Sequence, residues 1–260
     1  MRKITINLAA VAAFCIVVAS PALVSSSCAT PQTEQEDTTI IREDLGITAL
    51  KYSSPEVPSS IEFCGKVIDL SRFDRHERMD RELLAFTYMH STSLQMLKKA
   101  NRYFPIVEPI LKENGIPDDF KYLMVIESNM NPTARSSAGA AGLWQFMQGT
   151  GRDYGLEVNN NVDERYHIEK ATRAACRYLK DAYAKYKDWV AVAASYNAGQ
   201  ARIASQLAKQ DVDDSLDLQL VEETARYVYR ILAAKQLFSA PTTFGFRLRA
   251  SDLYPPIPYT

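Results

Sequence analysis

The sequence has few of the side chains that commonly hold metal ions or redox cofactors. It contains three histidines and four cysteines in 260 residues. His76, His90 and His167 share no metal-ligand spacing with the cysteines, so we expect no metal and no cofactor. An excess of charge is also lacking, because the formal net charge at pH 7 is −1. A nucleic-acid partner would require a strongly basic face, and none is expected.

Sustained alternation of polar and apolar residues, the pattern typical of strands, is absent, and so are internal repeats. Helical periodicity dominates from Asp80 onward, and the sequence therefore predicts an all-α fold. Pro105, Pro117 and Gly199 mark helix starts or ends. The expected helices span about 80–104, 105–114, 117–128, 140–147, 168–186, 189–198 and 218–238, and a non-helical tail follows.

The N-terminus has the layout of a secretory signal peptide. Arg2 and Lys3 precede an apolar run over 4–19, and small residues follow at 25–29. The run is shorter than the roughly 20 residues of a membrane span, so we expect export. Cys28 leaves two alternatives open, ordinary signal cleavage or lipid attachment that tethers the protein to a membrane. Ser25 stands where a lipoprotein signal usually has a branched aliphatic residue.

Glu127 is the first candidate for chemistry. On the helix expected over 117–128, Phe120, Leu123, Met124 and Glu127 follow the i, i+3, i+4, i+7 rule. A carboxylate therefore lies on the face that otherwise points into the core. Burial without a cationic partner raises a carboxyl pKa and suits a general acid near neutral pH. The alternative is an ordinary solvent-exposed glutamate at a helix end.

Several motifs follow Glu127-Ser128 in a fixed order. They are Asn131-Pro132, Ser136, the glycine-rich segment 139–147 with Trp144 and Gln145, then Tyr196-Asn197-Ala198-Gly199, and finally 223–228 with Tyr227. Glycine and alanine at this density let backbone approach backbone or ligand closely. Any one of these motifs alone is more simply explained by packing or capping.

In combination, these motifs resemble the catalytic domain of lytic transglycosylases, glycoside hydrolase family 23, which is related to goose-type lysozyme. The resemblance covers about residues 80–238 and implies a lysozyme-like (transglycosylase SLT) helical domain with a substrate cleft. The expected division is a signal peptide at 1–28, a flexible spacer and N-terminal extension at 29–79, the catalytic domain at 80–240 and the tail at 241–260.

The resemblance also implies roles for six residues. Glu127 is the acid that protonates the glycosidic oxygen and then the base that activates the attacking hydroxyl. Ser136, Gln145, Tyr196, Asn197 and Tyr227 are substrate-binding residues, and Tyr227 is expected to place its hydroxyl near the catalytic carboxyl. The implied substrate is the peptidoglycan glycan strand, cleaved between N-acetylmuramic acid and N-acetylglucosamine. The implied location is the periplasm or cell envelope.

Some residues depart from the family pattern or leave their roles open. Gln148 and Ser195 stand where proline and alanine are usual. Trp144 either stacks on a sugar or packs beneath the cleft, with packing favoured. Asp163-Glu164-Arg165 is better explained as a salt-bridge cluster than as catalytic. Cys64 and Cys176 either form a disulfide or remain separate thiols.

The reaction product follows from counting carboxylates. Ordinary glycosidases use two, whereas only Glu127 stands at a motif position here. The sequence therefore predicts that the substrate supplies its own nucleophile, which leaves 1,6-anhydro-N-acetylmuramic acid ends. The alternatives are a hydrolytic lysozyme of the same fold and a wall-binding protein without activity. The family's small sugar-binding repeats are not found, so wall anchoring would come from the cleft, from Cys28 or from a region outside this sequence.

Overall fold

The structure, a computed structural model, describes residues 54–257. The predicted signal peptide, Cys28 and the first part of the predicted spacer lie outside the described residues. The helices are α1 (Phe73–Tyr88), α2 (His90–Glu113), α3 (Phe120–Ser128), α4 (Gln148–Asp153), α5 (Ile168–Tyr186), α6 (Trp189–Ala198), α7 (Gln200–Lys209) and α8 (Glu222–Ser239), and the strands are β1 (Ser60–Phe63) and β2 (Lys66–Asp69). The mainly helical fold is as predicted.

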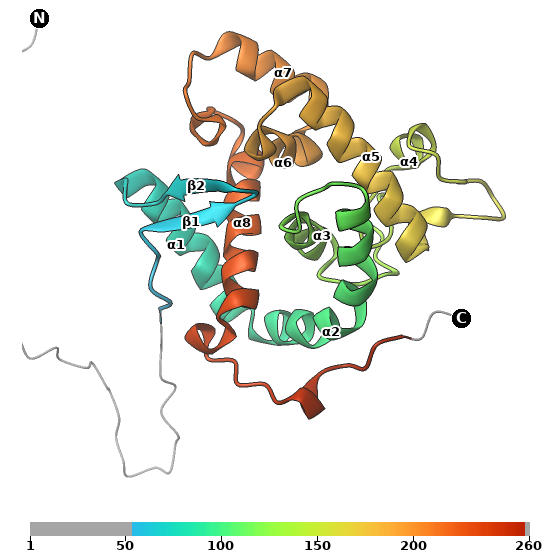
Figure 1. Ribbon diagram of the computed structural model, residues 1–260, viewed down its shortest axis with the longest axis horizontal. Helices are drawn as coiled ribbons and strands as arrows, with labels where there is room; N and C mark the ends of the chain where they lie inside the picture. The colour runs from blue at the N-terminus through green and yellow to red at the C-terminus, as the bar shows by residue number, and fades with distance from the viewer. Residues whose placement is uncertain (1–53, 258–260) are drawn as a thin grey trace, which may run out of the picture. The chain divides into compact units, whose positions relative to one another are not determined.

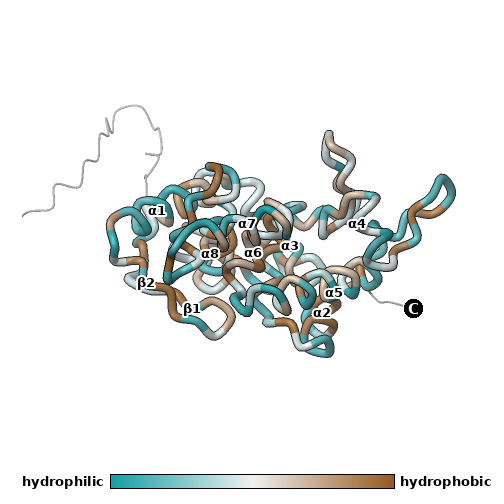
Figure 2. The backbone as a smooth tube through the Cα atoms, turned by 90° about the horizontal axis from the view of Figure 1, so that it is seen from above, coloured by the Kyte–Doolittle hydropathy of each residue, from teal (hydrophilic) through white to brown (hydrophobic). Residues whose placement is uncertain are grey.

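Helix α8 packs against three other helices. It packs along α1 on one side and against α3 and α6 on the other, while α5 packs against α2 and α6 (Figure 1). Hydrophobic segments concentrate where α3, α6 and α8 meet (Figure 2). Alanines let these helices approach closely, and Ala191, Ala193, Ala233 and Ala234 are all fully buried. The helices that carry Glu127 and Tyr227 are therefore held by shared core packing.

Three predicted helices are found with nearly the expected bounds. Helix α3 ends at Ser128 because Asn129 adopts a left-handed conformation, with φ of 49°. Helix α5 ends at Tyr186, where Lys187 is left-handed in the same way. Helix α6 begins after Asp188, whose carboxylate accepts the N–H groups of Val190 and Ala191. Local capping signals were therefore sufficient to predict where α3 and α5 end and where α6 begins.

The prediction that a new helix begins at Pro105 is wrong. Helix α2 continues through Pro105 and Pro109, and the chain breaks earlier, at Met89. At this break, the hydroxyl of Ser93 donates to the carbonyl of Phe86 at 2.6 Å. A side chain thus satisfies a carbonyl at the end of α1. Helix α1 begins at Phe73, seven residues before the predicted start at Asp80.

The helix predicted over 140–147 is not formed. Gly142 and Gln145 have φ values of 78° and 49°, and Ala141 pairs with Phe146 in an isolated bridge. Left-handed conformations are incompatible with a right-handed helix, so the segment folds as a loop. Helix α4 begins directly after it, at Gln148. Helix α7 was not predicted either.

The prediction that the chain contains no strands is wrong, because the structure has one short hairpin. Strands β1 and β2 pair antiparallel through a two-residue turn at Cys64-Gly65. Both turn residues have positive φ, 53° and 84°, the geometry that suits a tight hairpin. Ile61 and Phe63 point into the core. The hairpin lies in the stretch for which the sequence predicted a spacer and extension.

The described part of the chain settles two smaller points. Cys64 and Cys176 are free thiols, and Cys176 is a small buried side chain in α5. None of the helices between residues 54 and 257 combines the length and apolar character that a membrane span requires.

Candidate active site

Glu127 lies in the last turn of α3, on the side chain stripe that packs into the core. Phe120, Leu123 and Met124 on this stripe have no exposed surface, as predicted. The Glu127 side chain itself is partly buried. Helix α3 packs against both α2 and α8, so the carboxyl is held between fixed elements.

The surroundings of Glu127 change its acidity. Burial raises the pKa of this carboxyl to about 7, although the Tyr227 hydroxyl and the charge of Arg230 act in the opposite direction. Glu223 raises the pKa further by repulsion. When the pKa of a carboxyl is near neutrality, both the protonated acid and the carboxylate are present at pH 7. Such a group can donate a proton and then accept one.

Tyr227 comes from a distant part of the sequence to contact Glu127. It lies in α8, is 4% exposed, and donates its hydroxyl proton to Oε1 of Glu127. The pKa of Tyr227 is raised well above its usual value, first by burial and then by the charge of Glu127. The tyrosine therefore stays protonated and serves as a hydrogen-bond donor to the carboxylate.

Tyr196 and Asn197 bring helix α6 to the same region. Burial and the charge of Glu127 raise the pKa of Tyr196, whose hydroxyl donates to the carbonyl of Trp144 at 2.8 Å. The Oδ1 atom of Asn197 accepts the Thr224 hydroxyl at 2.8 Å, and its Nδ2 lies 3.5 Å from Glu223. These contacts connect α6 both to α8 and to the loop that precedes α4.

Ser136 and Gln145 lie in that loop, which we name the 134–146 loop. The Ser136 hydroxyl accepts the N–H of Ala140 at 3.0 Å. The Gln145 side chain donates to the carbonyls of Gly142 and Ala134 at 2.8 and 3.2 Å. Both side chains thus hold the loop in shape through hydrogen bonds with its own backbone, a role that their positions in the sequence did not indicate.

Arg165, which the sequence indicated only as part of a salt-bridge cluster, also holds the 134–146 loop in place. It is 1% exposed, pairs with Asp163 at 2.7 Å, and donates from Nη1 to the carbonyls of Gly139 and Phe146. The salt-bridge explanation of this segment is confirmed, and Arg165 in addition satisfies buried loop carbonyls. A single buried arginine in one short 3₁₀ turn, Glu164–Tyr166, gives no sequence pattern that would reveal this.

Trp144 is fully buried and packs in the core. Its indole N–H donates to the hydroxyl of Thr172 in α5 at 2.9 Å. The favoured packing role of this residue is confirmed, and the tryptophan fixes the loop to α5.

Other carboxylates near α3 have partners elsewhere. Asp118 pairs with Lys121, and Asp119 pairs with Lys235 at 2.8 Å. Both interactions lie at the start of α3, away from its Glu127 end. Among the described residues, no group of histidine, cysteine and acidic side chains is arranged to hold a metal ion.

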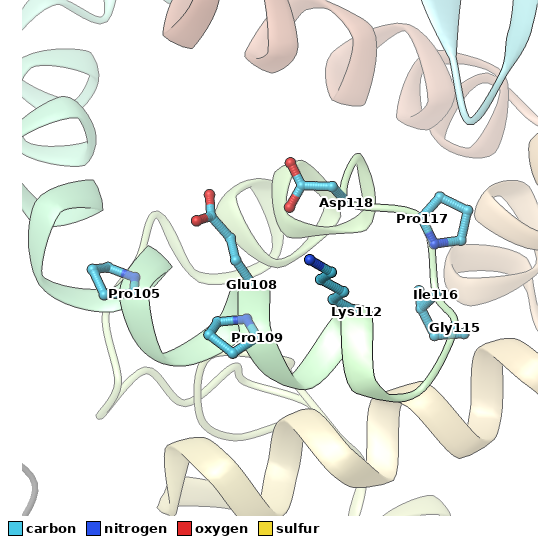
Figure 3. A pocket seen from close by; sticks show the side chains of 8 residues that line it. All are labelled: Pro105, Glu108, Pro109, Lys112, Gly115, Ile116, Pro117 and Asp118. Carbon is cyan, nitrogen blue, oxygen red and sulfur yellow. The ribbon is translucent and has the colours of Figure 1, made fainter.

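A pocket of about 820 Å³ opens at the junction of α2 and α3 (Figure 3). It contains none of the six residues predicted to act on substrate. Its acidic residues, Glu108 and Asp118, both pair with Lys121. The pocket is therefore a separate feature from the Glu127 region.

Part of this chain is similar to known proteins. The transglycosylase SLT domain matches residues 105–217. The chain is 30% identical over 181 residues to membrane-bound lytic murein transglycosylase D of Escherichia coli strain K12, covering 68% of this chain and 39% of that protein. It is 29% identical over 150 residues to membrane-bound lytic murein transglycosylase C of Haemophilus ducreyi, covering 52% and 40%.

A solved structure of the 70 kDa soluble lytic transglycosylase SLT70 of Escherichia coli is similar over 67% of this chain and 32% of that chain. Its TM-score is 0.49 and its sequence identity is 19%. The chain spans about two fifths of the length of the two curated relatives named above. The matched segment contains Glu127, the 134–146 loop and helix α6, so this chain carries a transglycosylase SLT domain over residues 105–217.

Proposed function

We propose that this protein is a lytic transglycosylase that cleaves the β-1,4 bond between N-acetylmuramic acid and N-acetylglucosamine in peptidoglycan. One observation carries the proposal: Glu127, within the segment that matches the SLT domain, has a pKa of about 7 and accepts a hydrogen bond from the Tyr227 hydroxyl. The names of the relatives, which refer to murein and transglycosylases, support the same substrate.

The proposed reaction uses Glu127 twice. The protonated carboxyl donates its proton to the glycosidic oxygen as the bond to C1 breaks. The resulting carboxylate then removes the proton from the C6 hydroxyl of the muramic acid, whose oxygen closes onto C1. Glu127 ends protonated, ready for another cycle. Ring closure within one sugar benefits from a high effective molarity and needs no enzymic nucleophile.

The remaining predicted residues support substrate binding in this proposal. Tyr227 and Tyr196 are placed to act near Glu127, and Tyr227 favours the carboxylate that forms after proton donation. In this proposal the hydrogen-bonding capacity that Ser136, Gln145 and Asn197 retain would contact the N-acetyl groups and hydroxyls of the sugar chain.

Product analysis tests the proposal. We expect mass spectrometry of digested peptidoglycan to show 1,6-anhydromuramic ends, one water lighter than hydrolysis products. Glu127→Gln should fold normally and lose activity by at least about 100-fold, because an amide cannot donate this proton. Fully hydrated muramic ends as the main product, or clearing by the glutamine variant equal to wild type, would overturn the assignment.

Glu223 gives the hydrolytic alternative a specific candidate. It is an exposed carboxylate in the first turn of α8 and lies close enough to raise the pKa of Glu127. A lysozyme would need such a group to orient water. If the products are hydrated, Glu223→Gln should abolish their formation. If the transglycosylase proposal is correct, this variant keeps the anhydro product.

The N-terminal sequence and the membrane-bound relatives support a location in the cell envelope. We propose that the chain is exported and that lipid on Cys28 tethers it to a membrane. Fractionation of cells that express Cys28→Ser checks this: the variant should leave the membrane fraction. An unchanged distribution would indicate ordinary signal cleavage, and a cytoplasmic wild-type protein would contradict export.

A further inference from the structure

A carboxylate in α1 is buried outside the site predicted from the sequence. Glu82 is 1% exposed, and its Oε1 accepts from Nε of Arg226 at 2.7 Å. Its Oε2 lies 3.5 Å from Nε of Arg230, and Nε of Arg81 is 3.4 Å from Oε1. A charge at such depth is tolerated only when cations compensate it. Glu82 therefore fixes two arginines of α8 in place.

The two arginines flank Tyr227 on α8. Arg226 and Arg230 are four residues apart and reach the same carboxylate, as side chains at this helical spacing can. Arg230 follows Tyr227 by three residues, so the two also share a face of the helix. Arg230 thus contacts the buried Glu82 on α1, and its charge also acts on Glu127 at the end of α3.

Three groups of α8 act on the pKa of Glu127, namely Tyr227, Arg230 and Glu223. Tyr196 of α6 faces the same carboxylate, whose charge raises the pKa of Tyr196. Arg230 is the cation among them, and its charge lowers the pKa of Glu127 against the effect of burial. A carboxyl that must act first as acid and then as base needs both influences.

We propose that Glu82 and Arg230 form a positioning pair for the reaction, in which Glu82 fixes Arg230 and Arg230 stabilises the Glu127 carboxylate after it has given up its proton. The inference rests on the proposed function. It also assigns a part of the active site to α1, which precedes the segment that matches the SLT domain. Neither residue contacts the substrate in this proposal.

The test measures Glu127 directly in the mature protein. Carbon-13 NMR of glutamate labelled at the side-chain carboxyl follows its titration, with the signal assigned from the Glu127→Gln spectrum. In Arg230→Gln the titration should move to higher pH, because a positive charge that favours the anion is gone. In Arg230→Lys, which keeps the charge, it should remain near the wild-type value. Arg173→Gln, which opens an exposed ion pair with Glu113, is the control and should change nothing.

Kinetics test the positioning role of Glu82. Glu82→Gln keeps the shape and one acceptor oxygen, and circular dichroism establishes that it is folded. We expect kcat on peptidoglycan fragments to fall about tenfold with little change in KM, because Arg230 loses its anchor and misplaced groups cost turnover. A Glu82→Gln enzyme with wild-type kcat would contradict this role.

The two readouts separate the inference from the proposed function. An unchanged Glu127 titration in Arg230→Gln rejects the pair, whether or not the wild-type protein cuts peptidoglycan. A shifted titration in a protein without such activity would retain the coupling of Arg230 to Glu127 and reject the substrate assignment, and with it the catalytic purpose of the pair.

Discussion

The neighbours of Glu127 shift its proton equilibrium in opposite directions. Burial and Glu223 favour the protonated acid, whereas Tyr227 and Arg230 favour the carboxylate. The balance brings the pKa to about 7, where the cost of either form is small. At the scale of single residues, the site is therefore tuned by a few contacts, and removing one of them should change both the rate and its pH dependence.

Tyr227→Phe removes the hydroxyl that favours the carboxylate. The pKa of Glu127 should rise further, so that the acid stays protonated to higher pH and the alkaline limb of the rate profile moves upward. We expect kcat to fall by about 10- to 100-fold, because the carboxylate formed in the reaction loses a charge-assisted hydrogen bond. Steady-state kinetics on soluble peptidoglycan fragments over about pH 5 to 9 measure both effects.

Two further variants are needed to interpret the kinetics of Tyr227→Phe. Tyr186→Phe removes a tyrosine hydroxyl that donates to the Gln200 carbonyl, and as a control it should leave the pH profile unchanged.

Ser136→Ala should lower turnover more than binding if the serine acts on the sugar as it becomes reactive. Unchanged kcat with a raised KM in Tyr227→Phe would instead identify a ground-state ligand.

The 134–146 loop shows how one element is held by others. Arg165 satisfies its carbonyls, Trp144 anchors it to α5, and Tyr196 connects it to α6. Gly142 lies where the loop passes the backbone of Arg165. A β-carbon at Gly142 would be 1.9 Å from the Arg165 carbonyl oxygen, a distance at which backbone must move.

Gly142→Ala should therefore destabilise the protein more than Gly139→Ala. Both glycines have positive φ, 78° and 88°, so both variants incur about 1 kcal/mol or more of backbone strain. A β-carbon at Gly139 has no neighbour within 4 Å, so its variant serves as the matched control. We expect an additional loss of at least about 2 kcal/mol for Gly142→Ala, measured by urea denaturation. Equal losses in the two variants would contradict the proposed close approach.

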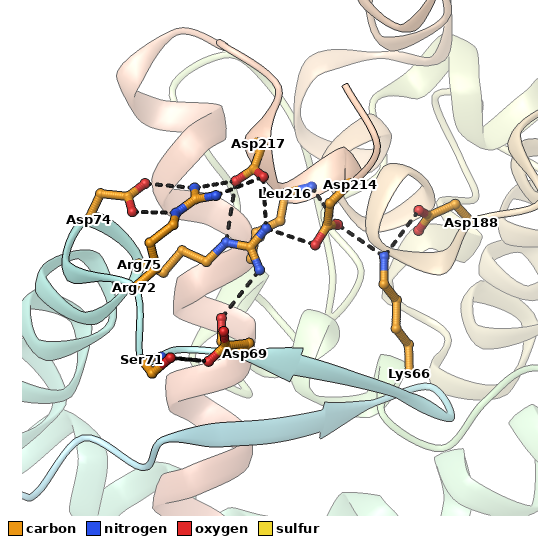
Figure 4. A network of polar contacts seen from close by, with 10 residues as sticks. All are labelled: Lys66, Asp69, Ser71, Arg72, Asp74, Arg75, Asp188, Asp214, Leu216 and Asp217. Atoms are coloured by element: carbon orange, nitrogen blue, oxygen red, sulfur yellow. Dashed lines mark hydrogen bonds and ion pairs between the residues drawn. The ribbon is translucent and has the colours of Figure 1, made fainter. Parts of the chain in front are cut away.

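A polar network connects segments that are far apart in the sequence (Figure 4). Arg75 of α1 pairs with Asp214 and Asp217 at 2.8 and 2.9 Å and donates to the carbonyl of Asp69, the last residue of β2. Lys66 of β2 pairs with Asp214 at 3.0 Å. At the scale of the whole described molecule, the network fastens the hairpin and α1 to the segment that precedes α8.

Arg75→Met should weaken this attachment. Arg75 is 7% exposed, and its loss leaves two aspartates without their buried cation, so we expect unfolding free energy to fall by about 2 kcal/mol at pH 7. Arg249→Met, which opens the exposed pair with Asp252, is the control and should have no measurable effect. Urea denaturation of the three proteins measures the difference.

The difference in unfolding free energy between the wild type and Arg75→Met should become smaller at acidic pH. Hydrogen bonds from Arg72 and Arg75 hold the pKa of Asp217 below its ordinary value of 3.8, despite burial. For Asp214, burial raises the pKa, but Lys66 and Arg75 outweigh it and lower the value. The stabilisation is thus complete above about pH 4 and is lost as pH falls through the lowered folded values. A wild-type advantage that grew on acidification would contradict the network.

The sequence predicted that Glu127 lies on a core-facing stripe and, through the family resemblance, that the Tyr227 hydroxyl lies near it, but not how the two are held. The helical spacing of Phe120, Leu123 and Met124 indicated that Glu127 faces the core, because the 3.6-residue period alone defines a helix face. Glu82, Arg165 and Arg230 gave no such signal. Their importance comes from partners 19 to 148 residues away, which only folding brings together.

What the sequence by itself determined is local. The ends of α3, α5 and α6 follow from residues within a turn of them, which can supply a cap or a left-handed conformation. The tertiary structure decided the rest. The 134–146 loop replaces a predicted helix because Arg165 and Tyr196 bind its backbone, and Tyr227 meets Glu127 only because α8 packs on α3. Such contacts depend on long-range packing, which propensity and spacing do not encode.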